Sequence, residues 1–426
     1  MPDRKHVNPF FDDESPFRQL HVSGKYNEYI ELADKEESDE NTLWKILGYA
    51  SKGDYSESKR LLETLSIDKL NPINRLNHFT LNGYACLRSA EINRASELFE
   101  KAHQVAIRLA AESPDSISIQ RSLISSYLNL AAIHQNKGFF QAGIDELEKA
   151  EKISSSINDF DQIFAVKFSM SQLYHKLGNL EEAKKCVLES LSYYRQRSNS
   201  QAIARSLFIL IGLTANSNRT ECEAYLNELR ILNDNSPEDH TRFIQLAYDL
   251  GLASFLKTSK RSREKIKAEI ILKKLIDYNN TNLYYTVAAI PILLELLIVE
   301  YQSYQELEVL EEINKYLELM IEIAEKSSMN EFIISGKMIK AQLASIEGDF
   351  NKVEEIIDET IKFTEKHQLH HFQNQIMNVK SELDSQFEEM QRLTKENASF
   401  GHRLERSELL NYLLKAQSYI ESEKNG

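Results

Sequence analysis

Apolar residues recur every three to four positions over residues 17–420, which is the period of an α-helix with one buried face. The stretch "YHKLGNLEEAKKCVLESL" interrupts this pattern with Gly178, and glycine readily adopts the left-handed conformation that closes a helix. After this glycine, four apolar residues fall on one helical face: Leu180, Ala183, Val187 and Leu191. The pattern predicts a helix, a tight turn and a second helix that packs back on the first.

The same arrangement recurs along the chain, at Gly24, Gly53, Gly138 and Gly348. A further copy lacks the turn glycine but keeps large and small residues at regular intervals: Phe79, Gly83, Ala95, Phe99 and Ala102. The spacing varies, since Gly138 and Gly178 are 178 − 138 = 40 residues apart and Gly24 and Gly53 are 53 − 24 = 29 apart. Residues 199–331 keep the helical period but fit the pattern less well, which indicates degenerate repeats.

These repeats resemble the tetratricopeptide-repeat (TPR) family, in which large and small residues occupy positions 4, 8, 20, 24 and 27 of a helix-turn-helix unit. The steps longer than about 34 residues resemble the long-repeat TPR variants of signalling regulators. The resemblance implies an all-α, right-handed α-solenoid of about eight helical hairpins followed by C-terminal helices. Only 13 glycines and 7 prolines in 426 residues agree with a chain that is mostly helical.

We expect three segments along the chain. Residues 1–13 contain little periodicity and are expected to be disordered or draped over the first hairpin. Residues 14–371 are expected to form the solenoid. Residues 372–426 carry two apolar stripes, which suit either a cap over the last repeat or a self-associating coiled coil, and the shortness of the stripes favours the cap. A monomer is therefore favoured, with a homodimer through the C-terminal helices as the alternative.

Composition and charge indicate where the protein is located and which kinds of molecule it can bind. A net charge of −14 disfavours binding to nucleic acid, whose phosphates require a basic surface. The most apolar stretch, "TVAAIPILLELLIVEYQ", is interrupted by Glu295 and Glu300, so we interpret it as a buried helix rather than a membrane span. Three widely spaced cysteines and an N-terminus without the order of a secretory signal predict a cytoplasmic protein.

The sequence contains no signature of an enzyme. No glycine-rich phosphate loop, nucleophile elbow or zinc-binding histidine pair with an intervening glutamate is present. His367 could share a helical face with His370 or His371, but a tight metal site requires three or four ligands. We therefore expect no catalytic activity, no metal and no cofactor.

The resemblance also implies where a partner binds, because TPR grooves are lined by positions 2, 5, 6, 9, 12 and 13 of each first helix. Carried over to this chain, these positions contain a polar cluster: Tyr84, Arg88, Asn129, Gln135, Asn136, Gln172, His175 and Lys176. The lysine and asparagine that form a carboxylate clamp in chaperone-docking TPR proteins are absent. The amides are instead expected to bond the backbone of an extended segment, with Arg88 and Lys176 attracting acidic side chains. The alternative is that these residues are ordinary solvated positions.

A second candidate surface is a short basic run, "KTSKRSREKIK". It would dock an anionic partner, although most such runs are solvated loops. Its basic members are Lys257, Lys260, Arg261, Arg263, Lys265 and Lys267.

Two functions follow from this sequence. The first is a non-enzymatic scaffold that binds a peptide or a partner helix in the concave TPR groove. The alternative is a peptide-responsive regulator that switches an effector by changing the pitch of its superhelix.

Overall fold

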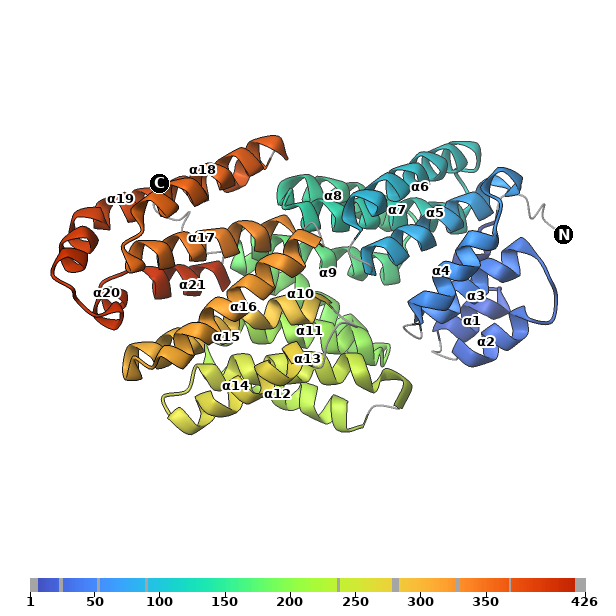
Figure 1. The fold of residues 1–426 in the computed structure, drawn as a ribbon. Helices are drawn as coiled ribbons and strands as arrows, with labels where there is room; N and C mark the ends of the chain where they lie inside the picture. Colours follow the sequence, from blue (N-terminus) through green and yellow to red (C-terminus); the bar gives the residue numbers. More distant parts are fainter. Residues whose placement is uncertain are drawn as a thin grey trace. The chain divides into compact units, whose positions relative to one another are not determined.

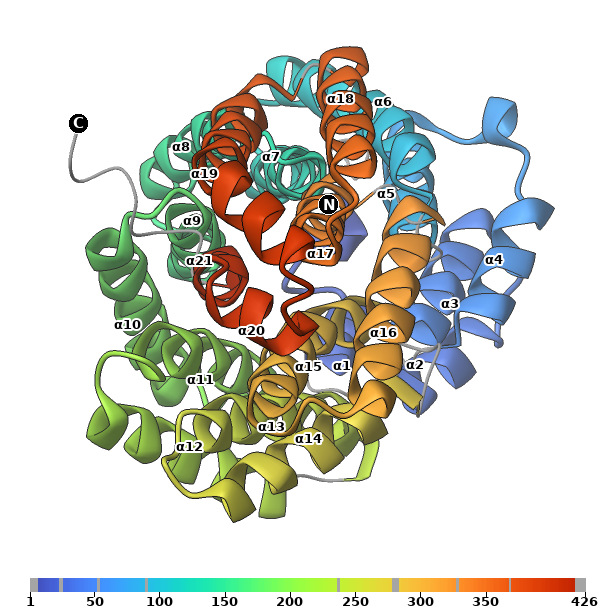
Figure 2. The same ribbon diagram turned by 60° about the vertical axis from the view of Figure 1, so that its left-hand side comes forward.

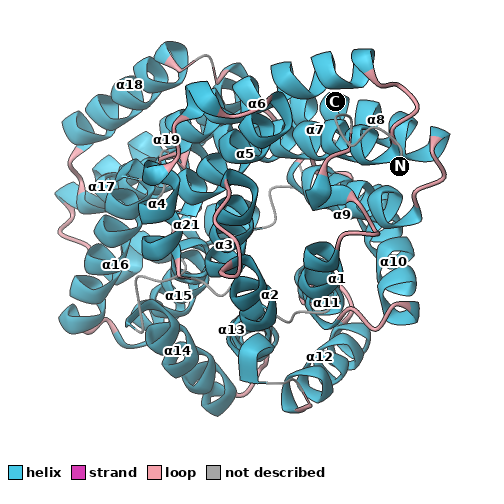
Figure 3. Cartoon of the chain, turned by 90° about the vertical axis from the view of Figure 1, so that its right-hand side faces the viewer, coloured by secondary structure: helices cyan, strands magenta, loops and turns pink. Residues whose placement is uncertain are grey.

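The computed structural model describes residues 7–22, 26–51, 54–88, 91–235, 238–277, 283–326, 329–367 and 369–417, and every regular element in these ranges is helical (Figures 1 and 3). The chain divides into two compact units. One contains residues 1–136 and 140–173, and the other contains residues 137–139 and 174–426, so that the helix Phe160–Lys176 crosses the division.

The helices of the first unit follow one another as successive pairs. In chain order they are α1 (Pro16–Val22), α2 (Tyr26–Ala33), α3 (Asp39–Ser51), α4 (Tyr55–Thr64), α5 (Pro72–Arg88), α6 (Ile92–Glu112), α7 (Ile117–Lys137), α8 (Phe140–Ser156) and α9 (Phe160–Lys176). Two short 3₁₀ turns, η2 (Pro9–Phe11) and η3 (Ile67–Lys69), precede α1 and α5. The first helix of a pair packs on the second and also on the first helix of the next pair, as α3 does on α4 and α5.

Small residues allow the paired helices of this unit to approach closely. A Cβ atom at Gly83 on α5 would lie 2.5 Å from the ring of Phe99 on α6, so any larger residue there would force the ring to shift. Ala95 and Ala102 on α6 are fully buried. Gly83, Ala95, Phe99 and Ala102 are therefore the positions at which α5 and α6 interlock, as the repeat pattern predicted.

The second unit continues the same arrangement. Its helices are α10 (Leu180–Gln196), α11 (Ser200–Thr214), α12 (Arg219–Asp234), α13 (Glu238–Lys257), α14 (Ser262–Asp277), α15 (Leu283–Tyr304), α16 (Leu307–Lys326), α17 (Asn330–Glu347), α18 (Phe350–Lys366), α19 (His370–Lys395), α20 (Phe400–Glu405) and α21 (Leu409–Gln417). Each helix from α10 to α18 contacts the next, and α11 contacts α13 just as α13 contacts α15. The described residues between 199 and 331, which fit the repeat consensus poorly, therefore form regular helices packed in the same order.

Local sequence signals set the ends of many helices. Gly138, Gly178 and Gly348 have φ values of 82°, 85° and 88°, the left-handed conformation predicted for the turns. Gly24 and Gly53 lie outside the described residues. Asparagine and aspartate side chains accept hydrogen bonds from the first-turn N–H groups of several helices, as Asn179 does for α10 and Asp349 does for α18.

The most apolar helix is α15. Over the described residues, Thr286–Tyr304 is the one helical segment long and apolar enough to cross a membrane. Of the most apolar 18 residues of this segment, 56% are buried within the protein. Its apolar side chains include Val287, Leu293 and Leu297, which pack in the interior. Pro291 lies inside this helix rather than at its start.

The C-terminal helices cover two surfaces of the second unit. The long helix α19 packs against α17 and α18. The ring centroids of Phe350 on α18 and Phe387 on α19 lie 4.8 Å apart. After α19, the chain turns back, and α20 and α21 pack on α15 and α17 (Figure 2). The apolar side of α21 is buried there through Leu409, Tyr412 and Leu413.

Candidate functional site

The seam between α5 and α7 brings together two residues of the predicted groove. The Tyr84 hydroxyl donates a hydrogen bond of 2.6 Å to Oδ1 of Asn129. Tyr84 is 43% exposed, whereas Asn129 is buried and its Nδ2 has no hydrogen-bond partner. Because a buried donor without an acceptor costs about 1–3 kcal/mol, the amide nitrogen of Asn129 is a point at which an added carbonyl would stabilise the protein.

Three further groove residues of the first unit lie partly buried. Gln135 and Asn136 are near the end of α7, and Gln172 is on α9. Nδ2 of Asn136 donates to the carbonyl of Ala132 at 2.8 Å, so one of its two amide hydrogens is already bonded within its own helix. The side chain of Arg88 lies outside the described residues.

The last two groove residues, His175 and Lys176, belong to the second unit. Lys176 forms an ion pair with Glu331 at the start of α17, with 2.6 Å between Nζ and Oε1. Its charge is therefore already balanced within the chain. Burial, assisted by the neighbouring Lys176 charge, lowers the pKa of His175 to about 4, so this imidazole is neutral at pH 7.

The basic run does not form a single surface. Lys257 is buried at the end of α13, with its side chain 5% exposed, and pairs with Glu295 on α15. The remaining basic residues lie around the first turns of α14, where Lys265 is partly buried and the others are exposed: Lys260, Arg261, Arg263 and Lys267. Glu264 lies among them and approaches Arg219 to 3.7 Å.

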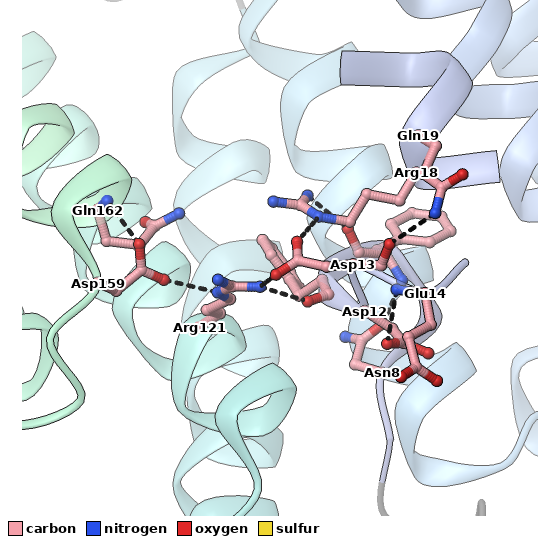
Figure 4. Close-up of polar contacts among 11 residues, drawn as sticks. Asn8, Asp12, Asp13, Glu14, Arg18, Gln19, Arg121, Asp159 and Gln162 are labelled. Atoms are coloured by element: carbon pink, nitrogen blue, oxygen red, sulfur yellow. Dashed lines mark hydrogen bonds and ion pairs between the residues drawn. The ribbon is translucent and has the colours of Figure 1, made fainter. Parts of the chain in front are cut away.

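The N-terminal segment binds between α5 and α7, a position that the sequence did not predict and that we call the slot. Figure 4 shows the polar contacts around Asp13 in this segment. Asn8 is fully buried, and its backbone N–H donates to Oγ of Ser118 at 3.0 Å. Its amide pairs reciprocally with that of Asn77, at 3.0 Å in one direction and 3.1 Å in the other, and Nδ2 also donates to Oγ of Ser122 at 2.9 Å. Residues 8–13 are thus held by the protein through polar contacts at their first residue.

Arg121 on α7 holds the other end of this segment, as Figure 4 shows. Its guanidinium donates to the carbonyl of Phe11 at 3.0 Å, to Oδ2 of Asp13 at 2.8 Å and to Oδ2 of Asp159 at 2.6 Å. Arg18 adds bonds to Asp13 and to the carbonyl of Phe10. Partial burial raises the pKa of the Asp13 carboxyl, but hydrogen bonds and charge attraction from Arg121 and Arg18 outweigh it, so the pKa lies below its usual value.

One signal in the sequence points to this slot. Helix α7 carries small polar residues where an ordinary core helix carries apolar ones, and four of them are buried: Ser118, Ser122, Ser126 and Asn129. Ser118 and Ser122 are one turn apart and therefore lie on the same face. A buried polar stripe of this kind requires hydrogen-bond partners from another segment, although the sequence does not say which one.

A second chain segment lies on first helices in the other unit. There α21 packs on α15 and α17, and α20 packs beside it (Figure 2). Phe400 of α20 meets Tyr301 of α15 with ring centroids 5.3 Å apart, and a Cβ atom at Gly401 would clash with Gln305. This surface therefore accommodates a short amphipathic helix.

Within the described ranges, no group of three or more histidine, cysteine, aspartate or glutamate residues is placed to hold a metal ion. His367 is exposed at the end of α18, and the side chains of His370 and His371 lie outside the described residues.

Paired helices, interlocking small residues and left-handed turn glycines define a TPR-like α-solenoid. Solved structures of other helical-repeat proteins share this fold. The chain is similar to a Rap protein complexed with competence and sporulation factor, with a TM-score of 0.54 and 13% identity over 88% of this chain and 98% of that one. It is also similar to NprR in complex with its cognate peptide NprX, with a TM-score of 0.54 and 16% identity over 80% of this chain and 94% of that one. No protein-family model and no curated protein matches the chain.

Proposed function

We propose that this protein is a non-enzymatic interaction scaffold that binds an extended peptide or a partner helix on the first helices of its repeats. The observation that carries the proposal is the buried Nδ2 of Asn129, which has no acceptor and lies beside the exposed Tyr84. The backbone carbonyl of a bound peptide supplies the acceptor that this group lacks.

The contacts made by the chain's own termini support this proposal. On α5 and α7 a short segment with one 3₁₀ turn is bound through its backbone and one asparagine side chain, and on α15 and α17 an amphipathic helix is bound through apolar side chains. The second of these, an amphipathic helix that lays its apolar face on the protein, is a recurring mode of peptide recognition. A peptide or protein partner fits such surfaces better than nucleic acid, because the chain carries a net charge of −14.

A second function, a peptide-responsive regulator, is favoured by the comparisons. The two similar structures are complexes, one with competence and sporulation factor and the other with a cognate peptide. In this version of the proposal, peptide binding changes the pitch of the superhelix and thereby switches an effector. A cytoplasmic setting and a monomeric state belong to the same proposal, and the odd number of widely spaced cysteines, all three of them buried, agrees with a reducing compartment.

The test begins with a partner isolated by pull-down on the intact chain and then titrated against variants. Replacing both Tyr84→Phe and Asn129→Ala removes the two ends of one hydrogen bond together, so the free energy of unfolding is expected to change by less than about 1 kcal/mol. The affinity for the partner is expected to fall about tenfold, because the peptide loses its contact with Asn129.

Asn93→Ala is the matched control, since Asn93 is exposed on α6, the second helix of its pair. This variant is expected to bind like the unmodified protein. Equal affinity of the folded double variant and the control would remove the α5–α7 seam from the proposed binding surface. A change in small-angle scattering on titration of the partner would favour the regulator over the rigid scaffold.

A further inference from the structure

Residues 8–13 occupy their slot as a bound peptide would. One backbone N–H, two backbone carbonyls, an asparagine side chain and a carboxylate all bond the protein, through Ser118, Asn77, Arg18 and Arg121. We propose that this slot is a recognition site for short acidic segments that form a 3₁₀ turn after an asparagine, as Pro9–Phe11 does after Asn8, and that residues 8–13 are its occupant in cis. A segment of the same chemistry, supplied in trans, replaces them.

The amide pair selects the first residue of the ligand. Oδ1 of Asn8 accepts from Asn77 while Nδ2 of Asn8 donates to Asn77, so each side chain uses both a donor and an acceptor. A carboxylate at this position would leave Oδ1 of Asn77 without a donor, and an aliphatic side chain would leave both Oδ1 and Nδ2 of Asn77 without a partner. Because Asn77 is buried, that loss is costly and makes the pair selective.

Arg121 selects acidity at the sixth residue of the ligand. Its guanidinium reaches both the Asp13 carboxylate and the carbonyl of Phe11, which fixes the distance between a backbone group and a charge. The Asp13 side chain is 69% exposed, so this ion pair is accessible to solvent and to a competing carboxylate. Asp159, buried beside Arg121, keeps the guanidinium in place when the ligand leaves.

The slot continues into the seam described above. Tyr84 lies seven residues after Asn77 on α5, and Asn129 lies seven residues after Ser122 on α7. Seven residues are two helical turns, or about 10 Å along each helix. The inference therefore deepens the proposed function, because the slot and the Asn129 amide lie on the same two helices.

The experiment uses a fluorescein-labelled peptide of residues 7–14, VNPFFDDE, and the full chain. In the variant carrying Asn8→Ala and Asp13→Ala, the cis segment loses both of its selective contacts. Fluorescence anisotropy is expected to show saturable binding of the peptide to this variant at least tenfold tighter than to the unmodified chain. Adding Asn77→Ala to the variant, or placing the same two alanines in the peptide, is expected to weaken binding at least tenfold.

Two results would overturn the inference. The absence of saturable binding to the folded variant would mean that residues 8–13 are a structural strap. Equal affinity for the variant and the unmodified chain would place the peptide elsewhere.

If the variant does not fold, hydrogen exchange on the unmodified chain replaces it. Excess peptide is expected to accelerate exchange of the backbone amides of residues 8–13, and unchanged exchange would refute the inference. Neither measurement requires the natural partner. A failed peptide titration therefore rejects only the cis-occupant idea, whereas an unaffected Tyr84/Asn129 double variant rejects only the proposed partner surface.

Discussion

The ion pair between Lys257 and Glu295 offers a direct test of how the second unit is stabilised. Lys257 ends α13 within a run of basic residues, yet its side chain is 5% exposed and lies 2.5 Å from a carboxylate oxygen of Glu295, itself 13% exposed. Lys257→Met keeps a long flexible side chain but removes the charge. The substitution leaves the Glu295 carboxylate largely buried without this cation.

The expected cost is large because removing one partner of a buried pair leaves an uncompensated charge. Such substitutions reduce the free energy of unfolding by about 3–5 kcal/mol. Replacing both residues, Lys257→Met with Glu295→Leu, removes both desolvation penalties and is expected to recover most of the loss. At Lys326, which is 73% exposed and pairs with the exposed Glu322, Lys326→Met is expected to cost less than about 1 kcal/mol.

Urea denaturation followed by circular dichroism measures all three variants against the unmodified chain. Lys257→Met is expected to be much less stable than Lys326→Met. The double variant is expected to be more stable than Lys257→Met, and it can equal or exceed the unmodified protein. A Lys257→Met variant no less stable than Lys326→Met would refute the burial of this pair. A double variant no more stable than Lys257→Met would refute the electrostatic explanation.

Three further predictions concern packing and pH. In urea denaturation, Gly83→Ala is expected to lower the free energy of unfolding by up to about 2 kcal/mol, because its Cβ would meet the Phe99 ring and this overpacking outweighs the gain in helix propensity. Gly212→Ala, whose Cβ would have nothing within 4 Å, is expected to raise the free energy of unfolding by up to about 1 kcal/mol. A change of the same sign at both sites would contradict this explanation. Because the pKa of His175 is depressed in the folded protein, the unfolded chain takes up a proton first as the pH falls. Lowering the pH from about 6.5 to about 4 is therefore expected to reduce the free energy of unfolding by up to about 3 kcal/mol through this residue, a loss that the His175→Gln variant does not show. Denaturation curves of both proteins over a pH series measure the difference. Leu413→Ala removes a fully buried side chain from α21 and is expected to cost about 2–5 kcal/mol, seen as faster hydrogen exchange in α21 and a lower melting temperature; an unchanged exchange rate would argue against its packing on α15 and α17.

The helices and their pairing could be predicted because their signals are local. The apolar period identifies a helix and its buried face within about fifteen residues, and the turn glycines at Gly138, Gly178 and Gly348 act through their own backbone conformation. The interlock of Gly83 with Phe99 is also a local signal, since both residues belong to one hairpin. These features determined the TPR-like fold without knowledge of any distant contact.

The partners of the polar residues were decided only by the tertiary structure. Asn8 meets Ser118 across 110 residues of chain, Lys176 meets Glu331 across 155, and Lys257 leaves the basic run to pair with Glu295. A sequence pattern shows that a residue is polar and which helical face carries it, but not which segment folds against that face. The physical reason is that hydrogen bonds and ion pairs depend on distances of about 3 Å between atoms, and only the packing of whole helices sets those distances.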